Sequence, residues 1–126
     1  MIEKSLTESL EMYLETIVRL ERREGKARVT DMARELGVSK PSVHIALHEL
    51  ENRGLAEHER YGAILLTPSG RKAAEEIARR HIILTEYLSR ILGVSAETAE
   101  KDACRIEHYL SMETMERIEE KVNGGR

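Results

Sequence analysis

The sequence predicts a mainly α protein, with a winged helix-turn-helix domain over residues 1–70 followed by an all-helical domain over residues 71–126. Three observations support this fold class. Apolar residues recur at helical spacing over most of the chain. Two short helical patterns separated by a glycine turn precede Gly54. Strand-like runs occur only between residues 55 and 67. At 126 residues, the chain has room for one domain or two very small ones.

The first helix is expected to run from an N-cap at Thr7 to about Arg23, and Gly25 is expected to end it. Thr is a favourable N-cap because its hydroxyl accepts a hydrogen bond from a free backbone N–H of the first turn. The apolar side chains of this helix share one face and predict its buried side: Leu10, Tyr13, Leu14, Ile17 and Val18.

A helix-turn-helix is expected next. Its first helix is short, with Thr30 as the expected cap, and the turn falls at Gly37. Its second helix is opened by Ser39 and carries Pro41 in the first turn, where a missing N–H is tolerated. The buried face of this second helix is expected to consist of Val43, Leu47 and Leu50.

A two-stranded wing is expected over residues 55–67, with its bend at Tyr61 and Gly62. Thr67 then caps a long helix to about Leu92, which Gly93 closes. Two further helices are expected to follow, from the cap Ser95 to about Leu110 and from Met112 to Val122.

Charge and cysteine content restrict the partners and the compartment. The net charge of −3 argues against nucleic-acid binding by bulk electrostatics, so any DNA contact must be local. The single cysteine, Cys104, allows no intramolecular disulfide and suits a reducing compartment, so a cytoplasmic location is expected. No stretch approaches the roughly 18 apolar residues of a membrane span, and no membrane partner is expected.

The second helix of a helix-turn-helix reads the major groove with its N-terminal residues. Here that segment has no carboxylate before Glu49, as a surface facing phosphates requires. Lys40 and the wing residue Arg60 are expected to contact phosphates. The alternative is a helical hairpin in which Ser39 and Pro41 only start a helix. The predicted DNA-binding residues are Ser39, Lys40, Pro41, Ser42, His44, Ile45 and Arg60.

Several potential metal ligands lie off the apolar faces. Met12 and Glu15 project from the side of the first helix opposite to its stripe. A methionine is more often a core residue than a ligand, but this position weakens that interpretation. In the helix expected after Ser95, one face beside the apolar stripe carries potential ligands, since residues three and four apart are neighbours: Glu100, Cys104, Glu107 and His108.

His81 falls within the apolar stripe of the long helix and is therefore expected to face inward. Taken singly, it could be a satisfied core histidine, Cys104 a small buried hydrophobe and Glu107 a solvated charge. Together, thiolate, carboxylate and imidazole are the ligands of first-row metals. The chain lacks the His-Glu-x-x-His pattern of zinc hydrolases, so sensing rather than catalysis is expected, and the protein is not expected to be an enzyme.

Over nearly its whole length the chain resembles the diphtheria toxin repressor and manganese transport regulator family. The segments that carry the resemblance are Leu10-Glu-Met-Tyr-Leu14, Ser39-Lys-Pro-Ser42, Leu66-Thr-Pro-Ser-Gly70, His81 and Asp102-Ala-Cys-Arg-Ile-Glu-His108. The resemblance implies a homodimer whose winged helices bind palindromic double-stranded operator DNA when metal is loaded, repressing genes of metal homeostasis. It also implies that residues 71–126 form the dimerisation and metal-binding domain.

The resemblance also implies a ligand set. Iron-type members use the residues that match Met12, Cys104, Glu107 and His108, and soft sulfur ligands favour Fe²⁺; Mn²⁺, Co²⁺, Ni²⁺ or Zn²⁺ can substitute. Manganese-type members place carboxylates where Met12 and Cys104 stand. A second site is expected at Glu15, His81 and Glu100, although Thr85 and Glu100 depart from the iron-type pattern there.

Two other hypotheses remain open at this stage. One is a metal-independent winged-helix regulator that binds an organic effector between its helices. The other is a small metal-buffering protein or a metalloenzyme. The resemblance favours the metal-dependent repressor, for which no small organic substrate is expected.

Overall fold

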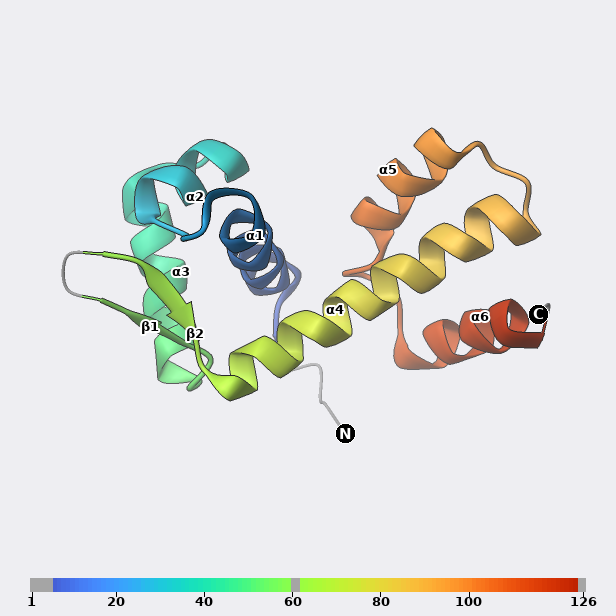
Figure 1. The fold of residues 1–126 in the computed structure, drawn as a ribbon. Coiled ribbons are helices and arrows are strands. Elements are labelled where there is room, and N and C mark those ends of the chain that lie inside the picture. The colour runs from blue at the N-terminus through green and yellow to red at the C-terminus, as the bar shows by residue number, and fades with distance from the viewer. Residues whose placement is uncertain (1–5, 60–61, 125–126) are drawn as a thin grey trace. The chain divides into compact units, whose positions relative to one another are not determined.

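A computed structural model describes residues 6–59 and 62–124 of the chain, which forms two compact units, residues 1–75 and 76–126. The described part is mainly helical with one two-stranded antiparallel sheet, so the predicted fold class is confirmed (Figure 1). None of the described helices is long and apolar enough to cross a membrane.

The first unit is a helix-turn-helix with a wing. It contains α1 (Glu8–Glu24), α2 (Val29–Leu36), α3 (Lys40–Asn52), β1 (Ala56–His58), β2 (Ile64–Leu66) and the start of α4 (Pro68–Glu86). The strands pair antiparallel with Ala56 opposite Leu66 and His58 opposite Ile64. Helices α1, α2 and α3 and the sheet all contribute to the core of this unit. Its fully buried residues include Leu14, Ile17, Leu20, Met32, Val43, Leu50 and Ile64.

Local capping chemistry sets most helix starts. The Thr7 hydroxyl accepts from the Leu10 N–H at 3.1 Å, and the Ser39 hydroxyl accepts from the Ser42 N–H at 3.2 Å, so both predicted caps are confirmed. The cap predicted at Thr30 is wrong. The N-cap of α2 is Arg28, two residues earlier, and it makes no side-chain cap hydrogen bond, whereas Thr30 already lies in the first turn.

The start of α4 requires a glycine. Thr67 accepts from the Gly70 N–H at 3.0 Å and donates to the Gly54 carbonyl at 2.6 Å, which ties the start of α4 to the turn that precedes β1. A Cβ at Gly70 would lie 1.9 Å from the Leu55 carbonyl oxygen. Only glycine permits this close approach.

The second unit consists of the rest of α4, a π-helical turn (Tyr87–Ile91), α5 (Ala96–Ile106) and α6 (Met112–Gly124). Its core consists of four aliphatic residues and one methionine: Ile83, Leu84, Ala103, Met115 and Val122. The long helix was predicted to run to about Leu92, but its last turn is π-helical, with the Leu92 N–H bonded to the Tyr87 carbonyl at 3.1 Å.

The helix after Ser95 is shorter than predicted. It ends at Ile106 rather than Leu110, because Tyr109 donates to the Ile106 carbonyl and closes a turn. Glu107 is therefore the C-cap residue of this helix, with its N–H bonded to the Ala103 carbonyl at 3.0 Å, and His108 lies beyond it. The wing residues Arg60 and Tyr61 lie outside the described residues, so the predicted phosphate contact of Arg60 stays a prediction.

Candidate metal centre and nucleic-acid interface

Two histidines and two glutamates meet in the second unit, and we call them the His–Glu cluster. His81 comes from α4, Glu100 from α5, and Glu107 and His108 from the turn that follows α5. The sequence separates His81 from Glu107 by 26 residues. Packing of α5 beside α4 within this unit brings these side chains together (Figure 1).

Glu107 is the centre of the His–Glu cluster. Its Oε1 lies 2.7 Å from Nδ1 of His81, and its Oε2 lies 3.1 Å from Nε2 of His108. The other ring nitrogen of His81, Nε2, lies 2.9 Å from Oε2 of Glu100. The Glu107 side chain is 0% exposed and that of His108 is 2% exposed, whereas Glu100 is 62% exposed. A buried carboxylate is stable only with such close partners.

His81 meets a carboxylate at each ring nitrogen. Burial lowers its pKa, but the hydrogen bond to Glu100 and the charge and hydrogen bond of Glu107 outweigh burial, so the pKa is raised above 6.5. An imidazole that donates from both nitrogens is the protonated form. A metal ion that binds to His81 must therefore displace a proton.

The donor set of the cluster fits a divalent first-row metal ion. Two imidazoles and two carboxylates are ligands of manganese, iron and zinc. Ligand bonds of about 2.1 Å place neighbouring ligand atoms roughly 3 Å apart. The three contacts within the cluster measure 2.7, 2.9 and 3.1 Å. A single ion could bind only one ring nitrogen of His81, so it would replace the proton either between His81 and Glu107 or between His81 and Glu100.

Arg80 supports the cluster, and the sequence analysis missed it. Its Nη1 donates to the backbone carbonyl of Glu107 at 3.0 Å, and the residue is only 9% exposed. Arg80 thus holds the turn after α5 against α4. A signal existed in the sequence, since Arg80 stands at a position of the apolar stripe between Ile77 and Leu84.

Replacing Arg80 with Met is expected to lower the free energy of unfolding by about 2 kcal/mol, because a buried charge-assisted hydrogen bond is lost. Metal affinity is expected to fall roughly 10- to 100-fold, as for other residues that orient ligands. Urea unfolding and calorimetric metal titration measure the two effects.

The matched control is Arg79→Met, one residue earlier. Arg79 is 48% exposed and pairs with Glu76 and Glu119 at the surface. Such pairs contribute at most about 1 kcal/mol. Equal losses of metal affinity in both variants would contradict a positioning role for Arg80.

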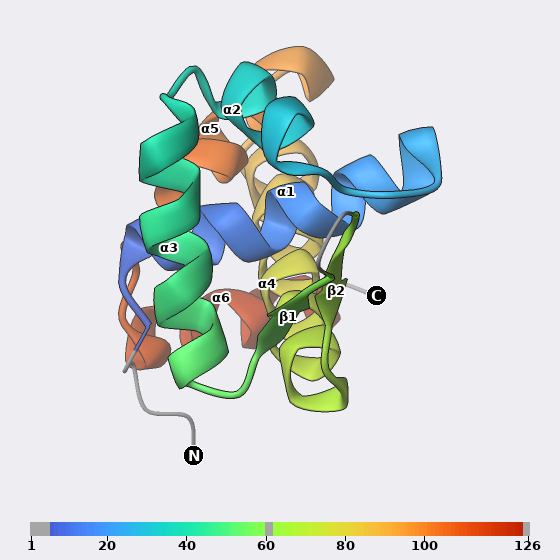
Figure 2. The ribbon, with the colours of Figure 1, turned by 90° about the vertical axis from the view of Figure 1, so that its left-hand side faces the viewer.

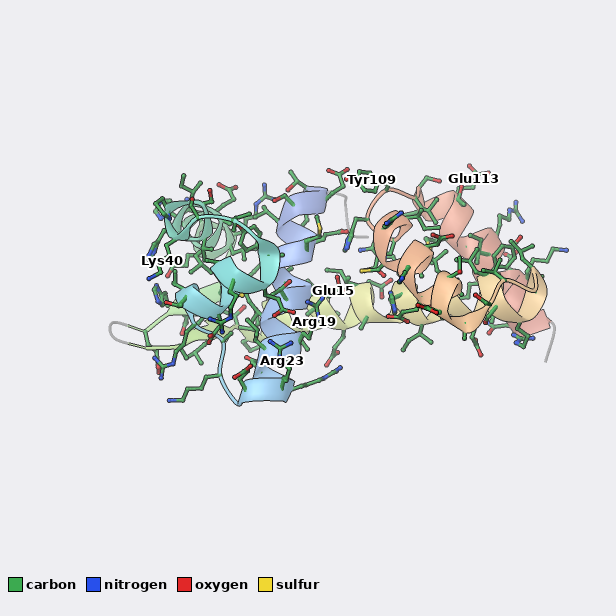
Figure 3. All side chains as sticks on the ribbon, turned by 90° about the horizontal axis from the view of Figure 1, so that it is seen from above. Glu15, Arg19, Arg23, Lys40, Tyr109 and Glu113 are labelled. Carbon is green, nitrogen blue, oxygen red and sulfur yellow. The ribbon has the colours of Figure 1, made fainter. Side chains whose placement is uncertain are left out.

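The remaining predicted ligands belong to other parts of the chain. Cys104 is exposed on α5, one turn after Glu100 and one turn before Glu107. Met12 and Glu15 belong to α1 in the first unit, where Met12 is 39% exposed, off the buried face as predicted. Figure 3 shows Glu15 on α1 in line with Arg19 and Arg23. From the predicted primary set, the structure thus joins Glu107 and His108, and it adds His81 and Glu100 to them.

The arginines of α1 stabilise the helix-turn-helix. Arg23 Nη2 donates to Glu35 Oε1 at 2.9 Å, and Arg19 Nη1 donates to Glu35 Oε2 at 3.4 Å. The hydrogen bond from Arg23 is the main cause of a lowered pKa of Glu35. These pairs link α1 to α2. The first turn of α3 itself contains no acidic residue.

The N-terminal half of α3 presents the surface predicted to read DNA. Val43, Ala46, Leu47 and Leu50 anchor the helix in the core. The predicted residues alternate with them on the outside, and Ile45 is 72% exposed although it is apolar. Lys40 stands at the helix start (Figure 3). The exposed set comprises Ser39, Lys40, Pro41, Ser42, His44 and Ile45.

Two domains of one known protein family match the two units of the chain. The N-terminal DNA-binding domain of the iron-dependent repressors matches residues 5–64. The metal-binding and dimerisation domain of the same repressors matches residues 67–124.

Curated relatives and solved structures agree with these matches. The chain is 38% identical to the HTH-type transcriptional regulator MntR of Geobacillus kaustophilus, over 92% of this chain and 82% of the relative. It is 42% identical to the transcriptional regulator MntR of Escherichia coli O157:H7, over 86% of this chain and 70% of the relative.

Among solved structures, IdeR of T. acidophilum aligns with a TM-score of 0.77 and 34% identity, over 97% of this chain and 56% of that one. A manganese-dependent transcriptional repressor in complex with manganese aligns with a TM-score of 0.78 and 32% identity, over 90% of this chain and 52% of that one. This chain thus spans little more than half the length of those two structures. These relatives and families are transcriptional regulators and not enzymes. The chain belongs to the diphtheria toxin repressor and manganese transport regulator family of metal-dependent transcriptional regulators.

Proposed function

We propose that this protein is a repressor that binds palindromic operator DNA as a homodimer once a divalent metal ion is bound. The observation that carries the proposal is the His–Glu cluster around the buried Glu107, in a chain that also presents a helix α3 whose first turn has no carboxylate. An ion at the cluster supplies positive charge where Glu107 now contacts two histidines. The genes it would control are those of metal homeostasis.

Two sets of donor atoms favour different metal ions. The sulfur ligands Met12 and Cys104 favour Fe²⁺, the ion expected from the sequence. The histidines and glutamates of the cluster suit Mn²⁺ equally, and manganese is the ion named for one of the similar structures. We propose Fe²⁺ as the physiological ion, with Mn²⁺ as the alternative and Co²⁺, Ni²⁺ or Zn²⁺ as substitutes.

Metal and DNA are proposed to bind with positive linkage. Met12 and Glu15, or Met12 alone, would join the ligands of the second unit in the metal-loaded protein. The ion would then restrict the arrangement of the DNA-reading helices before DNA binds. The entropic cost of binding the operator would therefore be smaller. By reciprocity, operator DNA would raise metal affinity by the same factor.

A homodimer would cover apolar side chains that the single chain leaves exposed. Ile82 is 61% exposed, Leu92 56% and Tyr109 69%, and all three lie in the second unit. Large exposed apolar groups of this kind are typical of association surfaces. A two-fold dimer would also present two copies of α3 to a palindromic site, about one DNA turn or 34 Å apart.

The decisive experiment measures binding to the DNA upstream of the protein's own gene, anaerobically and at a fixed salt concentration. Fe²⁺, Mn²⁺ and a chelator are compared, and sedimentation reports the number of protomers on the DNA. Tight binding of a dimer with a metal ion and none with chelator is the expected result. Chelator-resistant binding would instead favour the regulator with an organic effector. Failure to bind any DNA would contradict the repressor.

Cys104→Ala separates the two candidate ions. If the thiolate is a ligand, the variant is expected to lose about 10- to 100-fold in Fe²⁺ affinity and to change little with Mn²⁺, which prefers oxygen donors. Cys104 is exposed, so little change in stability is expected. Calorimetric titration with each ion measures the difference. Unchanged Fe²⁺ affinity would remove Cys104 from the ligand set.

A further inference from the structure

A ring contact joins α3 to the first strand of the wing. His44 lies on the exposed face of α3, and His58 is partly buried at the end of β1. Their ring centroids are 5.9 Å apart, and the ring planes are inclined by 42°. Aromatic rings attract one another at centroid separations of about 4.5 to 7 Å, so these two imidazoles are in contact. His44 is among the residues predicted to contact DNA, whereas no role was predicted for His58.

His58 belongs to an element that backbone hydrogen bonds hold in place. Its own N–H donates to Oε2 of Glu51 on α3 at 3.2 Å. In the sheet it stands opposite Ile64, whose N–H donates to the Ala27 carbonyl at 2.8 Å. The strand therefore lies against α3 in a defined register (Figure 2).

His44, by contrast, projects from the surface that α3 is predicted to present to the major groove. An exposed side chain samples several rotamers, and holding it in one of them when DNA binds has an entropic cost. A contact with an anchored ring reduces the number of rotamers before DNA binds. The remaining entropic cost of binding is then smaller.

We propose that His58 is a positioning residue for DNA recognition, which orients the His44 imidazole toward a base edge of the operator. This inference rests on the proposed function, because it concerns the same DNA-reading surface. An imidazole N–H can donate to N7 or O6 of guanine, or to N7 of adenine, in the major groove. The direction of that N–H determines which base is read, so the wing strand contributes to sequence preference through His44.

A double-mutant cycle tests whether His58 acts through His44. His44→Ala, His58→Ala and the double variant are compared with the wild type by fluorescence anisotropy, with saturating metal ion and the DNA upstream of the protein's own gene. His58→Ala is expected to weaken operator binding about 2- to 10-fold when His44 is present. It is expected to have no effect in the His44→Ala background, because no ring remains to be oriented.

A second DNA separates base recognition from general attraction to phosphates. Affinity for an unrelated duplex of the same length is expected to be unchanged in His58→Ala, since phosphate contacts carry non-specific binding. His58→Phe keeps a ring beside His44 and is expected to retain the wild-type affinity for the operator. Circular dichroism verifies that each variant is folded.

Glu57→Ala is the matched control, because Glu57 is exposed, adjacent to His58, and on the opposite face of β1. Any change that it causes in operator affinity is expected to be the same with and without His44.

The outcomes that contradict the inference are distinct from those that contradict the proposed function. Unchanged operator affinity in His58→Ala, or an equal loss in both backgrounds, would overturn the positioning role while the wild type still bound its operator. An equal loss for the operator and the unrelated duplex would also overturn it, since His58 would then act on phosphates. If the wild type bound no DNA at all, the proposed function would fail, and this inference with it.

Discussion

Glu107→Gln is expected to reduce the affinity for the activating metal ion at least 100-fold, equivalent to about 2.8 kcal/mol. The side chain is fully buried, and its two oxygens contact His81 and His108. Glutamine has nearly the same shape but no charge, and it presents an NH₂ where one of two oxygens was. Binding of Fe²⁺ and of Mn²⁺ by calorimetry measures the loss, and metal-dependent DNA binding is expected to disappear with it.

The pH dependence of stability gives this variant a second readout. His81 has a pKa raised above 6.5 in the folded protein, partly by the charge of Glu107. In the metal-free protein, the ion pairs of protonated His81 therefore stabilise the fold fully below the unfolded pKa of about 6.5, and this contribution is lost as pH rises through the folded pKa. Glu107→Gln is expected to weaken that dependence, as urea unfolding at several pH values would show.

Glu97→Gln provides the control on the same helix. Glu97 is 81% exposed and pairs only loosely with Lys101, at 3.5 Å. It is expected to bind metal as the wild type does. If Glu107→Gln also bound metal with unchanged affinity, the His–Glu cluster would not be the metal centre.

Local chemistry explains which parts of the fold the sequence could predict. The hydroxyls of Thr7 and Ser39 cap helices through bonds to residues three positions later, so the pattern is visible in a short window. The end of α5 is not set in this way. Glu107 keeps helical dihedral angles, φ −60° and ψ −25°, and its N–H still bonds to the Ala103 carbonyl, so the helical pattern continues past the last residue of the helix.

The residue types of the candidate site could be predicted from the sequence, but which side chains contact one another could not. An inward-facing His81 followed from its position in the apolar stripe. Its partners, Glu100 and Glu107, lie 19 and 26 residues away, and only the packing of α5 against α4 selects them. The same holds for Arg80, whose partner is a backbone carbonyl that has no signature in the sequence.

Ile45→Glu is expected to lower operator affinity at least 100-fold, or about 2.8 kcal/mol, without unfolding the protein. Ile45 is 72% exposed on the predicted DNA-reading surface, outside the buried core of the unit. A carboxylate there would repel the phosphates and replace an apolar group suited to a thymine methyl. Fluorescence anisotropy with operator DNA and saturating metal measures the change.

Ile45→Ala separates repulsion from lost contact, because it removes the apolar group without adding charge. Its loss of affinity is expected to be smaller, about 1 kcal/mol, and to depend on the base pair that Ile45 contacts. The loss of affinity in Ile45→Glu is expected for every DNA sequence. It is expected to vary with salt concentration, since it is electrostatic. Both variants should retain metal affinity, because Ile45 lies in the first unit and the His–Glu cluster in the second. Wild-type operator affinity in Ile45→Glu would mean that α3 does not face DNA.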